Sequence, residues 1–510
     1  MKTMQNKLGV ILGGLFLSIL MASMDNTIVA TAMGTIVGQL GGLDKFVWVT
    51  SAYMIAEMAG MPIFGKLSDM YGRKRFFIFG ILVFMLGSAL CGTAESIVQL
   101  SIYRAIQGIG GGALMPIAFT IMYDVVPPEK RGKLIGLFGA VFGMSSIFGP
   151  LAGAYITDYI KWEWIFYINL PLGLIAFAMI AFFYKESRQH AKQRIDWWGA
   201  TLLVGAVVCL MFALELGGKQ FAWDSVTIMS LFAAFVLLAV LFVIAERRAA
   251  EPIISFPMFR NRLFTTSNVI GMLSGAAFIA ASVYIPIFIQ GVLGGSATNS
   301  GLVLLPMMIG TVVTATAGGF LMNKLSYRTI MILTLLLLVA GILLLTTLSA
   351  DSSRLIITIY MILIGLGIGA SFSVLTNAAL HAIPESQRGA ASSTLNFLRS
   401  LGMTLGITAF GIIQSHSLTR KLSDTFSSGS QGAMPKDFNF SDPHTLLDPA
   451  TRAQIPGQAL GQITEGLSSS IVLTFAWGIV PAILALAAAF MMSREKMDPV
   501  AQGEGYATSH

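Results

Sequence analysis

The chain has 510 residues, of which 55% are hydrophobic and only 11% charged, with a mean hydropathy of +0.76. Soluble proteins carry about 25% charged residues, so this composition excludes a water-soluble globular protein and predicts that lipid solvates much of the chain. The net charge of +7 comes without any basic run interleaved with aromatic residues, which excludes a nucleic-acid-binding protein. The lipid bilayer is therefore the expected partner.

Apolar segments long enough to cross a bilayer recur along the whole chain. A spanning helix needs about 20 mostly apolar residues, and fourteen such segments are present. The first follows Lys2 and Lys7 as a signal peptide would, but its length and the interruption by Asp25 favour a retained helix. In chain order the predicted spans are 8–32, 46–65, 76–94, 97–122, 133–157, 164–184, 197–216, 226–245, 264–290, 300–322, 329–349, 354–378, 391–415 and 470–492.

The basic residues are distributed unequally between the two sides of these spans. With the N-terminus inside, 22 of the 32 Lys and Arg residues fall in cytoplasmic segments and eight in outer segments. This asymmetry predicts a multi-pass protein of the cell membrane with both termini in the cytoplasm. The long outer segment near 416–469 is polar and carries Gly, Ser and Pro. It is predicted to be a loop, either a disordered connector or a small ordered cap.

No pattern for catalysis, metal binding or nucleotide binding is present. The chain lacks a Walker-type phosphate loop, a His-Glu-x-x-His motif and a nucleophile elbow. Cys91 and Cys209 lie inside apolar segments, where cysteines serve as small packing residues. We therefore expect a secondary transporter rather than an enzyme, with no cofactor and with protons as the coupling ion.

An internal repeat links the two halves of the chain. At a constant offset of 257 residues, a glycine-rich stretch and the loop after it recur. The repeat predicts three regions: an N-terminal six-helix bundle over 1–190, two inserted spans over 191–250, and a C-terminal six-helix bundle over 251–510. The matching pairs are Gly108 and Gly365, Gly110 and Gly367, Gly112 and Gly369, Ala113 and Ala370, Pro127 and Pro384, Arg131 and Arg388, and Gly132 and Gly389.

The loop over residues 65–75 reads Gly-Lys-Leu-Ser-Asp-Met-Tyr-Gly-Arg-Lys-Arg. Its glycines allow close packing and turning, and its carboxylate suits a helix N-terminus. This spacing resembles the signature loop of the major facilitator superfamily. The resemblance implies that the loop's Asp contacts the chain just after Arg388 and closes the cytoplasmic side. The implied latch residues are Gly65, Asp69, Gly72, Arg73 and Arg388.

Further motifs resemble fourteen-helix drug/proton antiporters of the EmrB/QacA type. They are Met24–Val29, Arg104–Gly108, Trp162–Gly173 and Arg399–Gly402, with Glu163 standing where that family usually has Arg. The span 133–157 is similar to the antiporter motif, whose small residues permit tight helix contact and whose proline permits a bend. Its motif residues are Gly139, Gly143, Gly149, Pro150 and Gly153.

Three ionisable residues inside the predicted spans are candidates for proton coupling or substrate binding: Asp25, Glu57 and Arg104. A charge in hydrocarbon is costly and is therefore a functional hypothesis. Asp25 lies about 25 Å along the first span, in its outer half, and Arg104 lies at a similar depth. Burial favours the neutral acid and a nearby arginine favours the ionised one, so Asp25 is suited to exchange a proton. The alternative is a structural acid satisfied by Arg104 or by backbone groups.

The fold expected from these observations is an all-α polytopic membrane protein with the major facilitator architecture. The expected function is proton-coupled antiport that exports small amphipathic, often cationic compounds by alternating access. A dedicated exporter of a natural product, lipid or siderophore is the alternative. Two further alternatives are a proton-symporting importer and a membrane-embedded enzyme or sensor. The sequence names no adaptor partner and no particular small-molecule substrate.

Overall fold

The computed structural model describes residues 2–41, 45, 47–186, 195–218, 220–295, 297–381, 383–427 and 457–497. These residues are almost entirely helical, and their only β-type pairing is an isolated bridge between Gly217 and Phe221. The first half of the chain forms α1 (Lys2–Leu40), α2 (Val47–Tyr71), α3 (Arg73–Cys91), α4 (Ile97–Val125), α5 (Pro128–Tyr159), α6 (Trp164–Tyr167), α7 (Asn169–Phe183), α8 (Trp197–Leu216) and α9 (Val226–Arg248).

The second half begins with a short turn of helix and continues in long helices. Its elements are η1 (Phe256–Arg260), α10 (Arg262–Ile287), η2 (Phe288–Val292), α11 (Ala297–Leu321), α12 (Tyr327–Leu345), α13 (Arg354–Leu380), η3 (Glu385–Gln387), α14 (Arg388–Ser427) and α16 (Gly457–Phe490).

The predicted spans correspond to these helices. Among the described residues, 13 helical segments are long and apolar enough to cross a membrane. Helix α5, with 32 residues, covers the remaining predicted span over 133–157. The predicted all-α polytopic architecture is therefore confirmed.

Local side chains set where several helices begin. The hydroxyl of Ser96 accepts a hydrogen bond from the backbone N–H of Gln99 at the start of α4, and Ser225 does the same for Ile228 at the start of α9. Such caps satisfy N–H groups that have no partner within the helix. Helix α5 begins at Pro128, a residue whose fixed φ suits the first helical position.

The predicted outer loop near 416–469 is too long at both ends. Helix α14 continues to Ser427 and α16 begins at Gly457. The extension is stabilised by Leu418 and Leu422, each 1% exposed, which lie four residues apart on one helical face. They contact α16 where Gly466 permits a close approach. The middle of the predicted loop, 428–456, lies outside the described residues.

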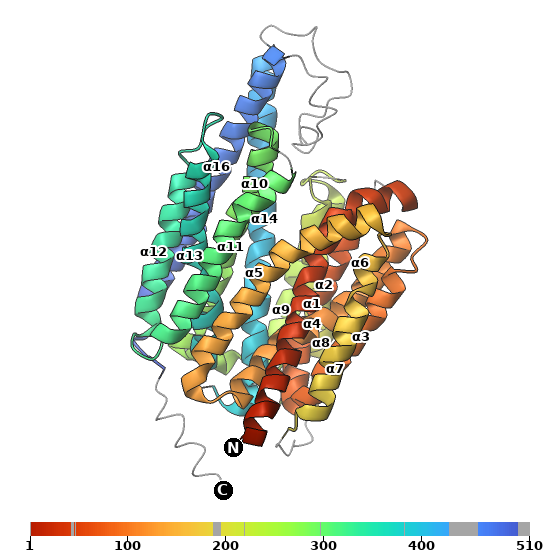
Figure 1. Ribbon diagram of the computed structural model, residues 1–510, viewed down its shortest axis with the longest axis vertical. Coiled ribbons are helices and arrows are strands. Elements are labelled where there is room, and N and C mark those ends of the chain that lie inside the picture. The colour runs from red at the N-terminus through yellow and green to blue at the C-terminus, as the bar shows by residue number, and fades with distance from the viewer. Residues whose placement is uncertain are drawn as a thin grey trace. The chain divides into compact units, whose positions relative to one another are not determined.

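The described helices pack into two compact units. Unit 1 comprises Met1–Asn268, Thr376–Leu398 and Lys496–His510, and unit 2 comprises Val269–Leu375 and Arg399–Glu495. In unit 1, α4 packs against α2 and α3, while α1 lies along α5 and α7 (Figure 1). In unit 2, α12 packs against α16. The three sequence domains set out above remain a prediction.

The internal repeat is visible in the packing of each unit. In unit 1, Gly108 lies against the carbonyl of Tyr53, on α2. In unit 2 its counterpart Gly365 lies against the carbonyl of Met307, on α11. A side chain at either glycine would collide with that backbone, so the same residue type serves the same close helix crossing twice.

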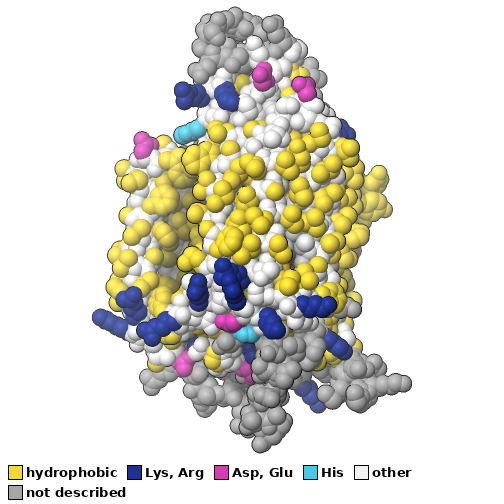
Figure 2. All heavy atoms as spheres, turned by 90° about the vertical axis from the view of Figure 1, so that its left-hand side faces the viewer, with side chains coloured by type: hydrophobic (Ala, Val, Ile, Leu, Met, Phe, Trp, Pro, Cys, Tyr) yellow, Lys and Arg dark blue, Asp and Glu magenta, His cyan; other side chains and the backbone are white. Residues whose placement is uncertain are grey.

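The surface is apolar over a broad band. On the face shown in Figure 2, hydrophobic side chains form this band and Lys and Arg side chains gather at one border. Helix α9 is the most apolar of the candidate spans, with a mean hydropathy of 3.0 and only 11% of its window buried. Its side chains Val226 and Leu237 are 85% and 59% exposed. Such exposure is expected for a helix that faces lipid.

Candidate functional site

Asp25 on α1 is completely buried and lies at the centre of a cluster of polar side chains. Its Oδ2 pairs with Nη1 of Arg104, and its Oδ1 accepts hydrogen bonds from Nε2 of Gln107 and Nδ2 of Asn169, both at 2.8 Å. The hydroxyl of Ser88 accepts from the same two amides, at 2.6 and 3.0 Å. All five side chains are 0% exposed. We call these five residues, from α1, α3, α4 and α7, the buried polar cluster.

The Arg104 guanidinium is held from several directions. Nη1 donates to Oε1 of Gln107 at 2.6 Å, and Nε donates to the backbone carbonyl of Val49 at 3.2 Å. Nη2 donates to Oδ1 of Asn26 at 3.3 Å, and the guanidinium carbon lies 4.2 Å from the centre of the Tyr53 ring. Carbonyls, an aromatic face and one carboxylate together offset the cost of placing this cation away from water.

The structure brings two of the three predicted coupling residues, Asp25 and Arg104, into direct contact. It also adds Gln107, Asn169 and Ser88, to which the sequence reasoning assigned no role. Arg104 and Gln107 are three residues apart, which places both on one face of α4. This spacing in the sequence could have predicted that Gln107 lies beside Arg104. Asn169 lies in the motif Trp162–Gly173, but its contact with Asp25 depends on how α7 rotates toward α1. Ser88 lies in no motif, and its position depends on how α3 rotates.

Glu57 lies on α2 apart from this cluster and is half-buried. Among the described residues no hydrogen bond or ion pair reaches its carboxylate. Glu57 lies four residues after Tyr53, whose ring packs against the Arg104 guanidinium, so it is a second acidic group close to the buried polar cluster.

Helix α1, which carries Asp25, is in close contact with α5. The Cα atoms of Gly149 and Gly153 face Thr27 and Thr31 so closely that a Cβ at either glycine would collide with a threonine hydroxyl. The Thr27 hydroxyl also donates to the carbonyl of Ser145 on α5, at 3.1 Å. Small residues thus allow the two backbones to meet beside the buried acid. Gly139, Gly143 and Pro150 lie on the same helix.

Asp69, near the end of α2, caps the start of α14. Its Oδ1 and Oδ2 accept the backbone N–H groups of Gly389 and Ala390, both at 2.9 Å. A carboxylate is favoured there by the free N–H groups and the helix dipole. Gly65 and Gly389 approach so closely that a side chain at either would meet the backbone of the other. Gly72 turns the chain between α2 and α3 with φ of 112°, a conformation that glycine adopts readily.

Basic side chains complete this contact. Arg73 pairs with Asp69 at 3.3 Å and with Asp124, and its Nη2 donates to the carbonyl of Glu385 at 2.8 Å. Nη1 of Arg388 lies 3.2 Å from Oδ1 of Asp124. The five predicted latch residues are therefore brought together, and Asp124 joins them. We call this group of six residues the latch cluster; all six belong to unit 1.

Arg399 in unit 2 is 7% exposed and has no ion-pair partner among the described residues. Its Nη2 donates to the backbone carbonyl of Ser371 at 3.0 Å, and its guanidinium lies 4.9 Å from the centre of the Phe372 ring. It is therefore not a copy of Arg104, which faces an acid.

A bundle of membrane-spanning helices around a buried ion pair defines a polytopic membrane transporter. The family model of the Major Facilitator Superfamily matches residues 15–199 and 187–407. The chain therefore belongs to the major facilitator superfamily and is a transporter, not an enzyme.

Curated relatives and solved structures agree with this assignment. The chain is 52% identical over 491 residues to "Multidrug resistance protein 3" of Bacillus subtilis (strain 168), covering 96% of each chain. It is 38% identical over 477 residues to "Multidrug transporter protein MdtP" of the same organism, covering 92% of this chain and 87% of that protein.

Two solved structures share the fold alone, because their sequence identity to this chain is low. The human organic anion transporter MFSD10 matches with a TM-score of 0.60 at 14% identity, over 93% of this chain and 99% of that one. The proton:xylose symporter XylE matches with a TM-score of 0.59 at 12% identity, over 97% and 99%.

Proposed function

We propose that this transporter is a multidrug exporter that exchanges protons for small amphipathic, often cationic compounds by alternating access. The names of the two Bacillus subtilis relatives support multidrug efflux. The motifs on α1, α5 and α14 support a place among fourteen-helix antiporters of the EmrB/QacA type. The distribution of Lys and Arg supports a cell-membrane location with both termini in the cytoplasm.

One observation carries the proton coupling: the carboxylate of Asp25 is completely buried and paired with Arg104. A buried ion pair is stable only while both charges are present. Protonation of Asp25 neutralises the carboxylate, so Arg104 loses its counter-ion and is stabilised only by other partners. The proton therefore changes which helix arrangement is favoured.

The proposed cycle uses this change. Protonation of Asp25 from outside releases bound substrate, the two halves rock, and loss of the proton to the cytoplasm resets the site. The close contact between α1 and α5 passes the movement of α1 to its neighbour. The latch cluster holds the cytoplasmic ends together in one phase of the cycle and separates in the other.

Proton stoichiometry sets the driving force. One proton exchanged for one monovalent cation moves no net charge, so only the pH gradient drives transport. With Glu57 as a second proton site, each cycle moves one net charge across the membrane. The membrane potential then also drives transport, by about 2.3 kcal/mol per charge per 100 mV.

The test is proton release from acidified inverted membrane vesicles on addition of tetraphenylphosphonium, a lipophilic cation. Wild-type vesicles are expected to release protons, and Asp25→Asn is expected to abolish the response. Asp351→Asn, which makes the same change at an exposed carboxyl group between α12 and α13, is the matched control and keeps the response.

Removal of the acid leaves Arg104 without its counter-ion, so the abundance of each variant in the membrane is measured in parallel. Asp25→Glu retains the charge and is expected to retain part of the response. Unchanged exchange by Asp25→Asn at normal abundance removes Asp25 from the coupling mechanism.

A further inference from the structure

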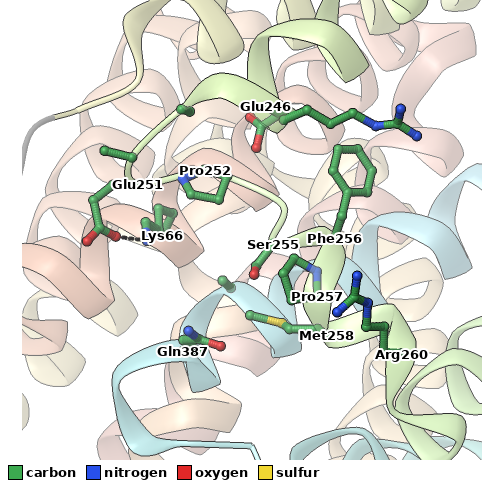
Figure 3. Close-up of a pocket in the computed structure, with 14 residues that line it drawn as sticks. Lys66, Glu246, Glu251, Pro252, Ser255, Phe256, Pro257, Met258, Arg260 and Gln387 are labelled. Atoms are coloured by element: carbon green, nitrogen blue, oxygen red, sulfur yellow. Dashed lines mark hydrogen bonds and ion pairs between the residues drawn. The ribbon is translucent and has the colours of Figure 1, made fainter.

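A cavity of about 670 Å³ lies beside the latch cluster and has no role in the proposed transport cycle. It is formed by the end of α9, the segment from Ala249 to Arg260, Lys66 on α2, Gln387 on η3 and the start of α14 (Figure 3). All of these elements belong to unit 1.

The two acidic groups that line this cavity already have partners. Oε2 of Glu251 lies 2.7 Å from Nζ of Lys66 (Figure 3). The carboxylate of Glu246 accepts the backbone N–H groups of Ile253 and Ile254, both at 3.2 Å. Each carboxylate thus stabilises the local fold and has limited capacity to neutralise a further cation.

Two arginines at the edge of the cavity remain unpaired. Arg247 and Arg260 are exposed, and neither has a hydrogen-bond or ion-pair partner among the described residues. The lining therefore carries three cations against two carboxylates. A guanidinium presents parallel N–H groups that match a phosphate oxygen pair, so two of them beside one cavity suit a phosphate group.

The approach to the cavity is apolar. On α9, Val240 and Ile244 are 52% and 43% exposed. They precede Arg247 at spacings of seven and three residues, so the three side chains share one face of the helix. Phe256 and Met258 add apolar surface inside the cavity (Figure 3). An apolar face that ends at a guanidinium fits a molecule with a hydrocarbon tail and an anionic head.

We propose that this cavity binds the phosphate headgroup of an anionic phospholipid, with its acyl chains along the exposed face of α9. Arg247 and Arg260 hold the phosphate, and Ser255 and Gln387 offer polar contacts to the rest of the headgroup. Basic pockets at the cytoplasmic ends of spanning helices suit such headgroups, and the predicted topology places the cavity in that leaflet.

The lipid would stabilise the latch cluster. Ala390 lines the cavity, and its backbone N–H is one of the two donors to Asp69. Lys66 lies in the same turn of α2 as Gly65 and Asp69. A ligand that contacts these elements together favours the arrangement in which α2 and the start of α14 remain joined.

The experiment is thermal unfolding of the purified full-length protein in detergent with added dioleoylphosphatidylglycerol. Dioleoylphosphatidylcholine and inorganic phosphate are the two comparison arms. Wild-type protein is expected to be stabilised by phosphatidylglycerol alone. Arg247→Gln combined with Arg260→Gln is expected to weaken the apparent lipid affinity at least about tenfold, because two charge-assisted contacts are lost.

Arg248→Gln is the matched control, because it removes one exposed charge from the same helix end without touching the cavity lining. It is expected to leave the lipid effect unchanged. Arg247→Lys with Arg260→Lys keeps the charge and loses the paired geometry, so an intermediate affinity is expected. The lysine variant also tests the role of the two arginines in case the glutamine variant does not fold.

Equal stabilisation by inorganic phosphate would show a soluble-anion site and overturn the lipid assignment. Equal lipid affinity of the double glutamine variant, or an equal loss in Arg248→Gln, would overturn the role of the two arginines. Because lipid binding is measured without transport, either result is independent of the proton-exchange test.

Discussion

At the scale of single residues, neutral amides do much to hold the buried acid. Asn169 and Gln107 both donate to Oδ1 of Asp25, while Arg104 pairs with Oδ2. Two of the three partners of the carboxylate therefore carry no charge. They fix its orientation without adding a second cation to the site.

Asn169→Ala removes one hydrogen bond to this carboxylate and one to the Ser88 hydroxyl. A hydrogen bond to a charged group contributes about 1.5–3 kcal/mol, so we expect a loss of that size in the free energy of unfolding. Thermal or denaturant unfolding in detergent measures it. Asn323→Ala, at an exposed position, is the control. Equal stability of the two variants would show that Asn169 contributes little to the cluster.

Gly72→Ala tests the turn of the latch cluster. With φ of 112°, the backbone there is strained for any residue with a Cβ, and the expected destabilisation is about 1–3 kcal/mol. Gly34→Ala on α1, where a Cβ meets nothing within 4 Å, is expected to stabilise slightly, because alanine restricts the unfolded chain. The measurement is the unfolding midpoint of each variant compared with that of the wild type. A similar change in the two variants would contradict the backbone strain assigned to position 72.

At the scale of helices, two kinds of contact connect the site to the rest of unit 1. Glycines on α5 allow it to lie against α1 near Asp25. Charges at the ends of α2, α4 and α14 join these elements through Asp69, Asp124 and Arg388. The first contact depends on small residues and one hydrogen bond between a threonine hydroxyl and a backbone carbonyl, whereas the second consists of charged groups that are either paired or separated.

A double-mutant cycle on Asp124 and Arg388 measures the second contact. Their ion pair is partly buried, with 21% and 14% of the side chains exposed, so screening is incomplete. We expect Asp124→Asn and Arg388→Gln to show a coupling free energy of about 0.5–3 kcal/mol in unfolding experiments. Strict additivity of the two single changes would show that the pair does not join α4 to α14.

At the scale of the whole molecule, the predicted topology has both termini inside. Cysteines introduced at Asp351 and Lys324, both exposed, are expected to lie outside and inside the cell, respectively. The native Cys91 and Cys209 are replaced by alanine first. A membrane-impermeant maleimide should label the first variant in intact cells and the second only in inverted vesicles. The reverse pattern would invert the topology and with it the side of the latch cluster.

Much of this architecture follows from the sequence alone. Long apolar runs specify spanning helices because hydrocarbon leaves backbone groups no partners except one another. The positions of the loop over 65–75, of Asp25 and Arg104, and of the glycines on α5 are likewise local patterns. The extension of α14 to Ser427 was missed, because it depends on packing of Leu418 and Leu422 against a distant helix.

The sequence offered Arg104 as a partner of Asp25, but the neutral partners of this carboxylate were decided only by the tertiary structure. Gln107 and Asn169 come from two different helices, and Asn169 is 144 residues away from Asp25 along the chain. An almost uniformly apolar helix shows little periodicity from which its inward face could be predicted. The rotation of each helix is set by small residues that let backbones meet and by polar groups that must find partners. The sequence alone therefore determined which residues are embedded, and helix packing determined which of them meet.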